Sequence, residues 1–108
     1  MSFAKETEKL VNDLIQAEYQ NACEKFGEKY NSLHEGYAIL KEEVEEVKEQ
    51  TRKLRLIKPV WNEIKNDNKN ILYKLLDLME IGVICAIKEL AQVGAVLMKI
   101  KNTLEVEE

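Results

Sequence analysis

The chain has 108 residues, of which 45% are hydrophobic, which is enough for one domain with a modest core. Its sixteen basic and twenty acidic residues give a net charge of −4, which argues against a dedicated nucleic-acid-binding domain, because such domains carry a basic stripe or patch. Strand-like alternation is absent, and the four glycines and one proline offer little turn chemistry, so the composition indicates an all-α fold.

The cysteines and the apolar segments bear on the cellular compartment. Cys23 and Cys85 lie far apart in apolar surroundings, which indicates reduced core thiols rather than a disulfide framework or a zinc cluster. The amino terminus lacks the basic start and apolar run of a secretory signal. Residues 81–100 are long enough to span a bilayer, but charged and amide side chains interrupt them, so we expect a buried helix instead. The sequence therefore predicts a cytoplasmic protein without a membrane partner.

The first predicted helix covers residues 2–26. Its apolar residues recur at intervals of three and four, as in an amphipathic helix: Leu10, Val11, Leu14, Ile15, Ala22 and Phe26. Gly27 is well placed to end this helix. The sequence SLHE that follows has the form of a capping box, in which Ser32 caps a second helix and Glu35 reaches back to it.

The second predicted helix covers residues 32–58. Its core positions form a heptad seam: Tyr37, Leu40, Val44, Val47, Thr51 and Leu54. We expect Pro59 to kink or end this helix, since proline lacks a backbone donor. A short helical stretch around Trp61 and the polar loop at residues 66–70 follow.

The third predicted helix covers residues 71–103 and is apolar on most sides. It should therefore form the centre of the bundle, where Gly82 and Gly94 would allow a neighbour to approach closely. The acidic tail, residues 104–108, is expected to be frayed. In this interpretation residues 1–108 form a single helical domain.

Two pairs of polar residues stand out by their spacing. On a helical wheel of the second helix, Glu43 lies roughly 70° and Glu46 roughly 130° from the centre of the heptad seam. Glu42 is nearly opposite the seam. Because residues three apart share a helix face, Glu43 and Glu46 offer two carboxylates to one point. Glu89 and Gln92 have the same spacing on the third helix. If the two helices pack antiparallel or obliquely, these side chains converge into a cluster of oxygen ligands.

Such a cluster has a definite chemical preference. Crowded carboxylates in a partly apolar cleft resist ionisation unless a cation compensates their charge. Oxygen donors favour Mg²⁺, with Mn²⁺ as a substitute, over zinc. The simpler alternatives are that the acidic run is a solvated helix face and that Glu89 pairs with a lysine or arginine from a neighbouring helix.

The sequence SLHEGYAILKEEVEEV, followed by KELAQVGAVLMKI, resembles the MazG-like nucleotide pyrophosphohydrolases, particularly small phage and prophage members. The family's signature is two adjacent glutamates with a third three residues on, and then Glu-x-x-Asp. Glu42, Glu43 and Glu46 match its first half. Glu89 matches the glutamate of the second half, but Gln92 stands in place of the aspartate, and the stretch between the halves is longer than usual. The resemblance covers about residues 26–104.

Three helices with so apolar a third member leave surface that a second subunit would cover. The resemblance points the same way and implies a helical bundle of the all-α NTP pyrophosphatase type, completed by oligomerisation as a homodimer or homotetramer. It implies Mg²⁺-dependent cleavage of a nucleoside triphosphate to a monophosphate and pyrophosphate, in nucleotide-pool housecleaning. Glu43, Glu46, Glu89 and Gln92 would then hold the metal, Gln92 through an uncharged oxygen. Glu42 would reach a second ion or orient the attacking water.

Two other functions are compatible with the same residues. The chain would be a non-catalytic helical interaction module if the heptad seam formed an oligomer interface. It would be a family member that binds metal or nucleotide without turnover if Gln92 prevented catalysis.

The remaining candidates have simpler explanations. We expect His34 to cap a helix or lie on the surface, and Trp61 to pack at the edge of the core. Asp77 and Glu80 are expected to lie on a solvated helix face. The basic run at residues 48–58 is expected to pair with neighbouring glutamates along the helix.

Overall fold

The computed structural model describes residues 2–107, which form helices joined by two short links. The helices are α1 Ser2–Phe26, α2 Leu33–Thr51, α3 Ile57–Lys65 and α4 Lys69–Glu107, with a 3₁₀ helix, η1 Arg52–Leu56, between α2 and α3. The prediction of an all-α fold is therefore confirmed for the described part of the chain.

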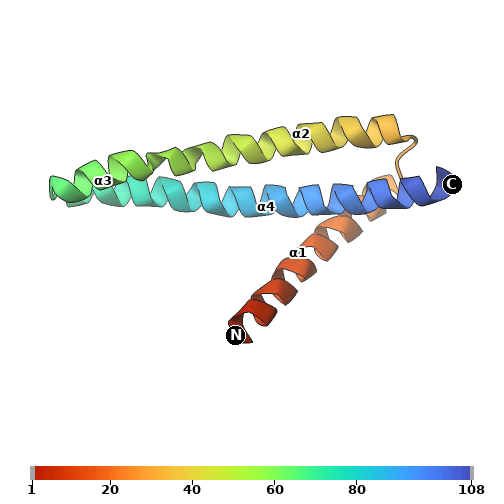
Figure 1. Ribbon diagram of the computed structural model, residues 1–108, viewed down its shortest axis with the longest axis horizontal. Helices are drawn as coiled ribbons and strands as arrows, with labels where there is room; N and C mark the ends of the chain where they lie inside the picture. Colours follow the sequence, from red (N-terminus) through yellow and green to blue (C-terminus); the bar gives the residue numbers. More distant parts are fainter. Residues whose placement is uncertain (1, 108) are drawn as a thin grey trace.

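The helices form an elongated hairpin with one oblique arm. α2, η1 and α3 follow one another along one side of the hairpin, and α4 runs antiparallel to them along the other (Figure 1). α1 crosses α4 near its C-terminal end, and the first half of α1 projects away from the hairpin (Figure 1). The radius of gyration is 18.2 Å, against about 13 Å for a compact chain of this length.

The start of α2 contains half of the predicted capping box. Ser32 Oγ accepts a hydrogen bond from the backbone N–H of Glu35 at 3.1 Å, which is the predicted N-cap. The carboxylate of Glu35 does not return to Ser32 but accepts a hydrogen bond from Asn31 Nδ2 at 3.0 Å. The second half of the box is thus replaced by a contact with the preceding residue.

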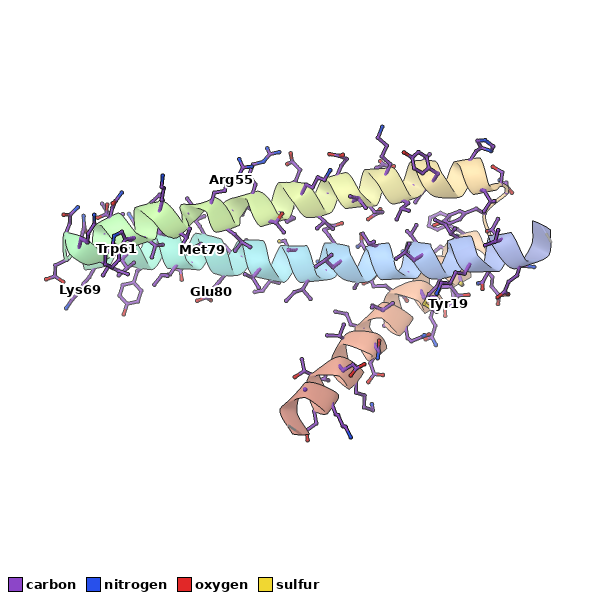
Figure 2. The ribbon with its side chains drawn as sticks, in the orientation of Figure 1. Tyr19, Arg55, Trp61, Lys69, Met79 and Glu80 are labelled. Atoms are coloured by element: carbon purple, nitrogen blue, oxygen red, sulfur yellow. The ribbon has the colours of Figure 1, made fainter. Side chains whose placement is uncertain are left out.

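The prediction of an unbroken helix over residues 32–58 is wrong. The α-helix ends at Thr51, and Pro59 lies in the first turn of α3, where its missing N–H is not needed. Two predicted core positions are exposed, Tyr37 by 65% and Leu54 by 40%, while the other four members of the seam are half-buried. Trp61 is also exposed, by 57%, and lies at the end of the hairpin rather than in the edge of a core (Figure 2).

α4 is longer than predicted at both ends. It begins at Lys69, because Asn68 Oδ1 accepts a hydrogen bond from the N–H of Ile71 and caps the first turn. It continues without a break through Gly82 to Glu107. The tail expected to be frayed is therefore helical over residues 104–107, and Glu108 lies outside the described residues.

The core consists of small side chains at close helix contacts. Its buried apolar residues are Ala86, Ala91, Ala95 and Val96 from α4 and Tyr30 from the link before α2. A Cβ on Gly94 would lie 2.9 Å from the side chain of Ile15, and one on Gly82 would lie 2.8 Å from Lys53 Cβ. The predicted close approach of neighbours at both glycines is confirmed. Both cysteines are free and half-buried.

Much of the apolar surface of α4 is uncovered. α1, α2, η1 and α3 all pack on α4, but its outer residues are 45–60% exposed: Ile81, Ile84, Ile87, Leu90 and Leu97. By length and composition α4 is able to cross a membrane, and 28% of its most apolar window is buried. The accessible surface of the molecule is 8382 Å², against about 6,200 Å² for a compact monomer of this mass. In the single chain the outer face of this helix is therefore exposed, and it is apolar surface of the kind that the sequence predicts for contact with a second subunit.

Candidate metal centre

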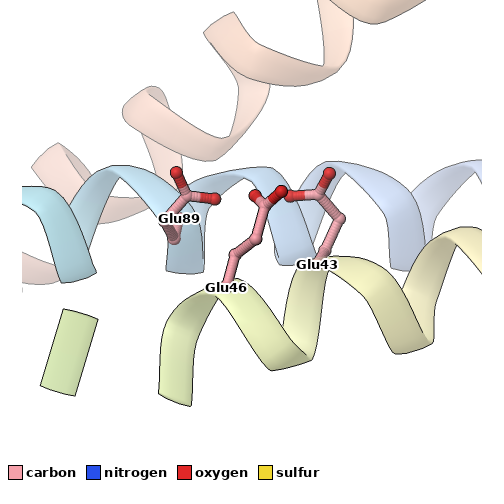
Figure 3. Close-up of side chains that lie close together, drawn as sticks. All are labelled: Glu43, Glu46 and Glu89. Atoms are coloured by element: carbon pink, nitrogen blue, oxygen red, sulfur yellow. The ribbon is translucent and has the colours of Figure 1, made fainter. Parts of the chain in front are cut away.

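Three carboxylates meet in the middle of the hairpin. Glu43 and Glu46 are one turn apart on α2 and point toward α4, from which Glu89 points back (Figure 3). One oxygen from each of the three lies within 4.8 Å of the others. Glu43 and Glu89 are half-buried, and Glu46 is exposed. The antiparallel packing of α2 and α4 therefore brings together three of the four predicted metal ligands, which we call the acidic cluster.

Gln92 lies against the same cluster. With its amide nitrogen turned toward the carboxylates, it donates hydrogen bonds to Glu43 Oε2 at 3.0 Å and to Glu89 Oε2 at 3.1 Å. It thereby links the two helices and stabilises negative charge on both partners. To act as a metal ligand, as the resemblance implies, the amide would have to turn over so that its oxygen faced the ion.

The cluster resists full ionisation. Burial raises the pKa of Glu89 to about 7, with further contributions from a hydrogen bond to Glu46 and from the charges of Glu46 and Glu43. Lys88 lowers that pKa by a smaller amount. Burial also raises the pKa of Glu43, as do the charges of Glu46 and Glu42. Near neutral pH the cluster therefore shares a proton, or else requires a cation in its place.

The donor set fits a hard divalent cation. The three carboxylates supply only oxygen atoms, the ligands that Mg²⁺ and Mn²⁺ prefer, and the exposed side of Glu46 leaves room for water or a phosphate oxygen. Among the described residues, no histidine or cysteine belongs to this group. Zinc is therefore a poor match.

The other sequence candidates lie outside the cluster. Glu42, the predicted catalytic residue, is exposed and not one of the three grouped carboxylates, although its charge acts on Glu43. His34, Asp77 and Glu80 are exposed. Two residues of the basic run pair with preceding glutamates as predicted: Lys48 lies 3.6 Å from Glu45, and Arg52 lies 3.5 Å from Glu49.

A pocket of about 460 Å³ adjoins the cluster, between the end of α1, the start of α2 and the second half of α4. Glu43 and Gln92 line both the pocket and the cluster. Sequence reasoning missed two pocket residues: Lys99, which is 4% exposed, and Tyr30, whose ring centroid lies 4.3 Å from Lys99 Nζ. The signal for Lys99 was its position seven residues after Gln92, which places both on one face of α4.

Comparisons with known proteins do not place the chain in a family. No protein-family model, curated protein or solved structure matches it.

Proposed function

We propose that this chain is a Mg²⁺-dependent nucleoside triphosphate pyrophosphohydrolase, which releases a nucleoside monophosphate and pyrophosphate in a cytoplasmic, nucleotide-pool role. The observation that supports it is the meeting of Glu43 and Glu46 with Glu89 across α2 and α4. These are the residues that match the glutamates of the MazG-like signature. The raised pKa of Glu89 also supports the proposal, because a bound cation would offset the repulsion between the crowded carboxylates.

In this proposal each residue has a separate task. A bound Mg²⁺ supplies neutralisation of triphosphate charge and acidification of a bound water. Glu43, Glu46 and Glu89 would hold the cation, and Glu89 would have to be ionised to do so. Gln92 fixes the carboxylates of Glu43 and Glu89 through its amide. Glu42 acts from the exposed side, where it orients water or reaches a second ion.

The proposed active form is a homodimer in which the second copy covers the outer face of α4. Each chain exposes about 2,000 Å² more than a compact monomer would, so two chains can together bury about 4,000 Å². Stable homodimers bury about 2,000–5,000 Å². A homotetramer would use the same apolar faces together with the projecting half of α1, where Leu10 and Val11 are 69% and 49% exposed.

The exposed apolar faces also favour a second candidate, a non-catalytic helical oligomerisation module. In that case assembly would be the function, and the acidic cluster would remain protonated or bind cations weakly. A third candidate binds metal or nucleotide without turnover, and the amide of Gln92 in place of a carboxylate supports it, because the metal would receive less negative charge.

Calorimetric titration with Mg²⁺ and Mn²⁺ separates these candidates. The titrations are made with and without a non-hydrolysable triphosphate, for the wild type and for Glu43→Gln and Glu89→Gln. Glu45→Gln is the matched control, because Glu45 is an exposed neighbour whose partner is Lys48 rather than the cluster. We expect both cluster variants to abolish binding and the control to retain it. Pyrophosphate release from a panel of triphosphates is then measured.

Each result selects one candidate. Metal binding that depends on both helices, together with pyrophosphate release, supports the enzyme. Such binding without turnover of any triphosphate supports the binding-only family member. A wild-type protein that binds neither cation but still assembles would overturn the enzyme proposal and leave the interaction module.

A further inference from the structure

Lys99 is a buried cation without an anionic partner. Its side chain is 4% exposed, and it makes no ion pair with any side chain that the structure describes. Its ammonium group instead lies over the ring of Tyr30, 4.3 Å from the centroid, and lines the pocket beside the acidic cluster. The ammonium group is not sealed from solvent, because no fully buried polar side-chain atom among the described residues lacks a hydrogen-bond partner. It therefore faces the pocket, where it can meet an anion from outside the chain.

The surroundings hold Lys99 and Tyr30 in fixed positions. Thr103 Oγ donates a hydrogen bond to the backbone carbonyl of Lys99 at 2.8 Å and accepts one from the backbone N–H of Tyr30 at 2.9 Å. Thr103 and Tyr30 are buried, with 3% and 9% exposure. The pocket wall is therefore preorganised, and a ligand would not have to order it.

The charged groups of the pocket are arranged for a ligand with more than one polar end. The charged residues that line the pocket are three lysines and three glutamates: Lys25, Lys29, Lys99, Glu18, Glu35 and Glu43. Glu43 also belongs to the acidic cluster. A phosphate at the lysines binds without a metal, and where it extends toward Glu43 a cation shared with the carboxylates would strengthen its binding. Phosphate groups bind lysine and divalent cations alike, so they suit both ends of this arrangement.

We propose that Lys99 is an anion receptor in a pocket for a phosphate-bearing ligand of nucleotide size, whose phosphate lies between Lys99 and the acidic cluster. The volume of about 460 Å³ is within the range of small-molecule sites. That the ligand is a nucleotide rests on the proposed function. Binding of phosphate at Lys99 itself requires no metal, which makes the two proposals separable.

The test is NMR titration of the intact protein in EDTA, in which the lysine ¹³Cε signals are followed. The probes are AMP, pyrophosphate and adenosine, and the variants are Lys99→Met, Lys99→Arg and the control Lys101→Met. Lys101 is exposed and two residues away. Methionine keeps the apolar stem of Lys99 and removes its charge, so loss of binding cannot be attributed to a cavity. Circular dichroism monitors the helix content of each variant.

We expect AMP or pyrophosphate to shift the Lys99 signal, Lys99→Met to weaken binding about ten- to hundredfold, Lys99→Arg to recover most of it, and Lys101→Met to change it little. AMP binding would identify the ligand as a phosphate ester, and binding of pyrophosphate alone would identify an inorganic anion. No shift of Lys99 in the wild type, equal binding by Lys99→Met, or equal binding of adenosine would each overturn the proposal. Lys99-dependent AMP binding without triphosphate turnover would leave this proposal standing while the proposed function fails.

Discussion

The two halves of α4 have similar apolar sequences but different surroundings. In the second half, residues 89–107, both α1 and α2 pack on α4 (Figure 1), and Ala91, Ala95 and Val96 are at most 8% exposed, although Leu90 and Leu97 on the outer face are 53% and 45% exposed. In the first half, residues 69–88, the neighbours are the far end of α2, η1 and α3, all on one side (Figure 1). Ile84 and Ile87 in that half are 60% and 49% exposed.

The difference shows that the apolar content of a helix does not determine how much of it is buried. Burial depends on how many other helices of the chain pack against each segment of the helix. The acidic cluster and the adjoining pocket lie where the second half begins, next to the region in which α1 adds a third layer. Glu43 and Glu89, the half-buried members of the site, thus lie next to the region where α1 packs, while Glu46 is exposed to solvent.

The largest expected effect is a loss of stability caused by a substitution in the second half of α4, residues 89–107. Ala91→Asp would place a charge among buried side chains, and we expect it to lower the free energy of unfolding by roughly 3 kcal/mol or more. Urea unfolding followed by circular dichroism measures the change, with the exposed Lys101→Asp as control. A loss below about 1 kcal/mol would mean that the second half is not packed as described.

A charged substitution in the first half of α4, residues 69–88, should instead weaken assembly. Ile84→Asp would place a charge in the proposed dimer interface, so we expect the dissociation constant to rise on the order of a hundredfold with the helix content unchanged. Sedimentation velocity over a range of concentrations measures it, with the exposed Lys74→Glu as control. A wild type that is monomeric at all concentrations would remove the homodimer from the proposed function.

The pH dependence of stability tests the cluster at the boundary of the two halves. Because the pKa of Glu89 rises from its ordinary value of 4.5 to about 7, the folded state binds more protons than the unfolded state between these values. The free energy of unfolding should therefore fall as the pH rises from about 5 to 7, by roughly 1–2 kcal/mol after solvent screening. Thermal unfolding at both pH values should show a smaller fall for Glu89→Gln. Equal falls in both proteins would show that Glu89 is not responsible.

The smallest expected effect concerns Gln92, the fourth of the predicted metal ligands. Gln92→Asp would replace the bridging amide by a carboxylate, the residue type that the MazG-like pattern has at this place. We expect Mg²⁺ affinity to rise about tenfold because the site gains a charge, at some cost to stability without the cation. Calorimetry compares it with Gln92→Asn, which stays uncharged. Unchanged affinity would indicate that position 92 does not face the ion.

The sequence allowed the prediction of those parts of the fold that depend on local signals. The N-cap at Ser32, the helix end before Gly27 and the close contacts at Gly82 and Gly94 all follow from residue type and spacing. The convergence of Glu43 and Glu46 with Glu89 also followed, because a spacing of three defines a face and antiparallel packing brings the two faces together.

The features that sequence reasoning missed depend on contacts between distant segments. The exposure of the outer face of α4 depends on how far α1 reaches, which no local pattern encodes. Lys99 was taken as an interruption of an apolar run, and only its contact with Tyr30, 69 positions earlier, reveals it as part of a pocket. The hydrogen bonds of Gln92 require both helices to be in place.

The 3₁₀ helix η1 has a consequence for the rotational phase of the hairpin. A 3₁₀ helix turns about 120° per residue and an α-helix about 100°, so its five residues add roughly 100° of rotation, which is the contribution of one α-helical residue. An unbroken helix would have continued the seam of α2 through Leu54. In the structure Lys53 packs against Gly82 of α4, and Leu54 is 40% exposed beside Leu76 and Val83 of α4. Leu56 and Val60 are half-buried. The segment therefore changes the rotation of α3 about the helix axis relative to α2. A chain with one residue inserted here could present the same faces to α4 as a continuous α-helix.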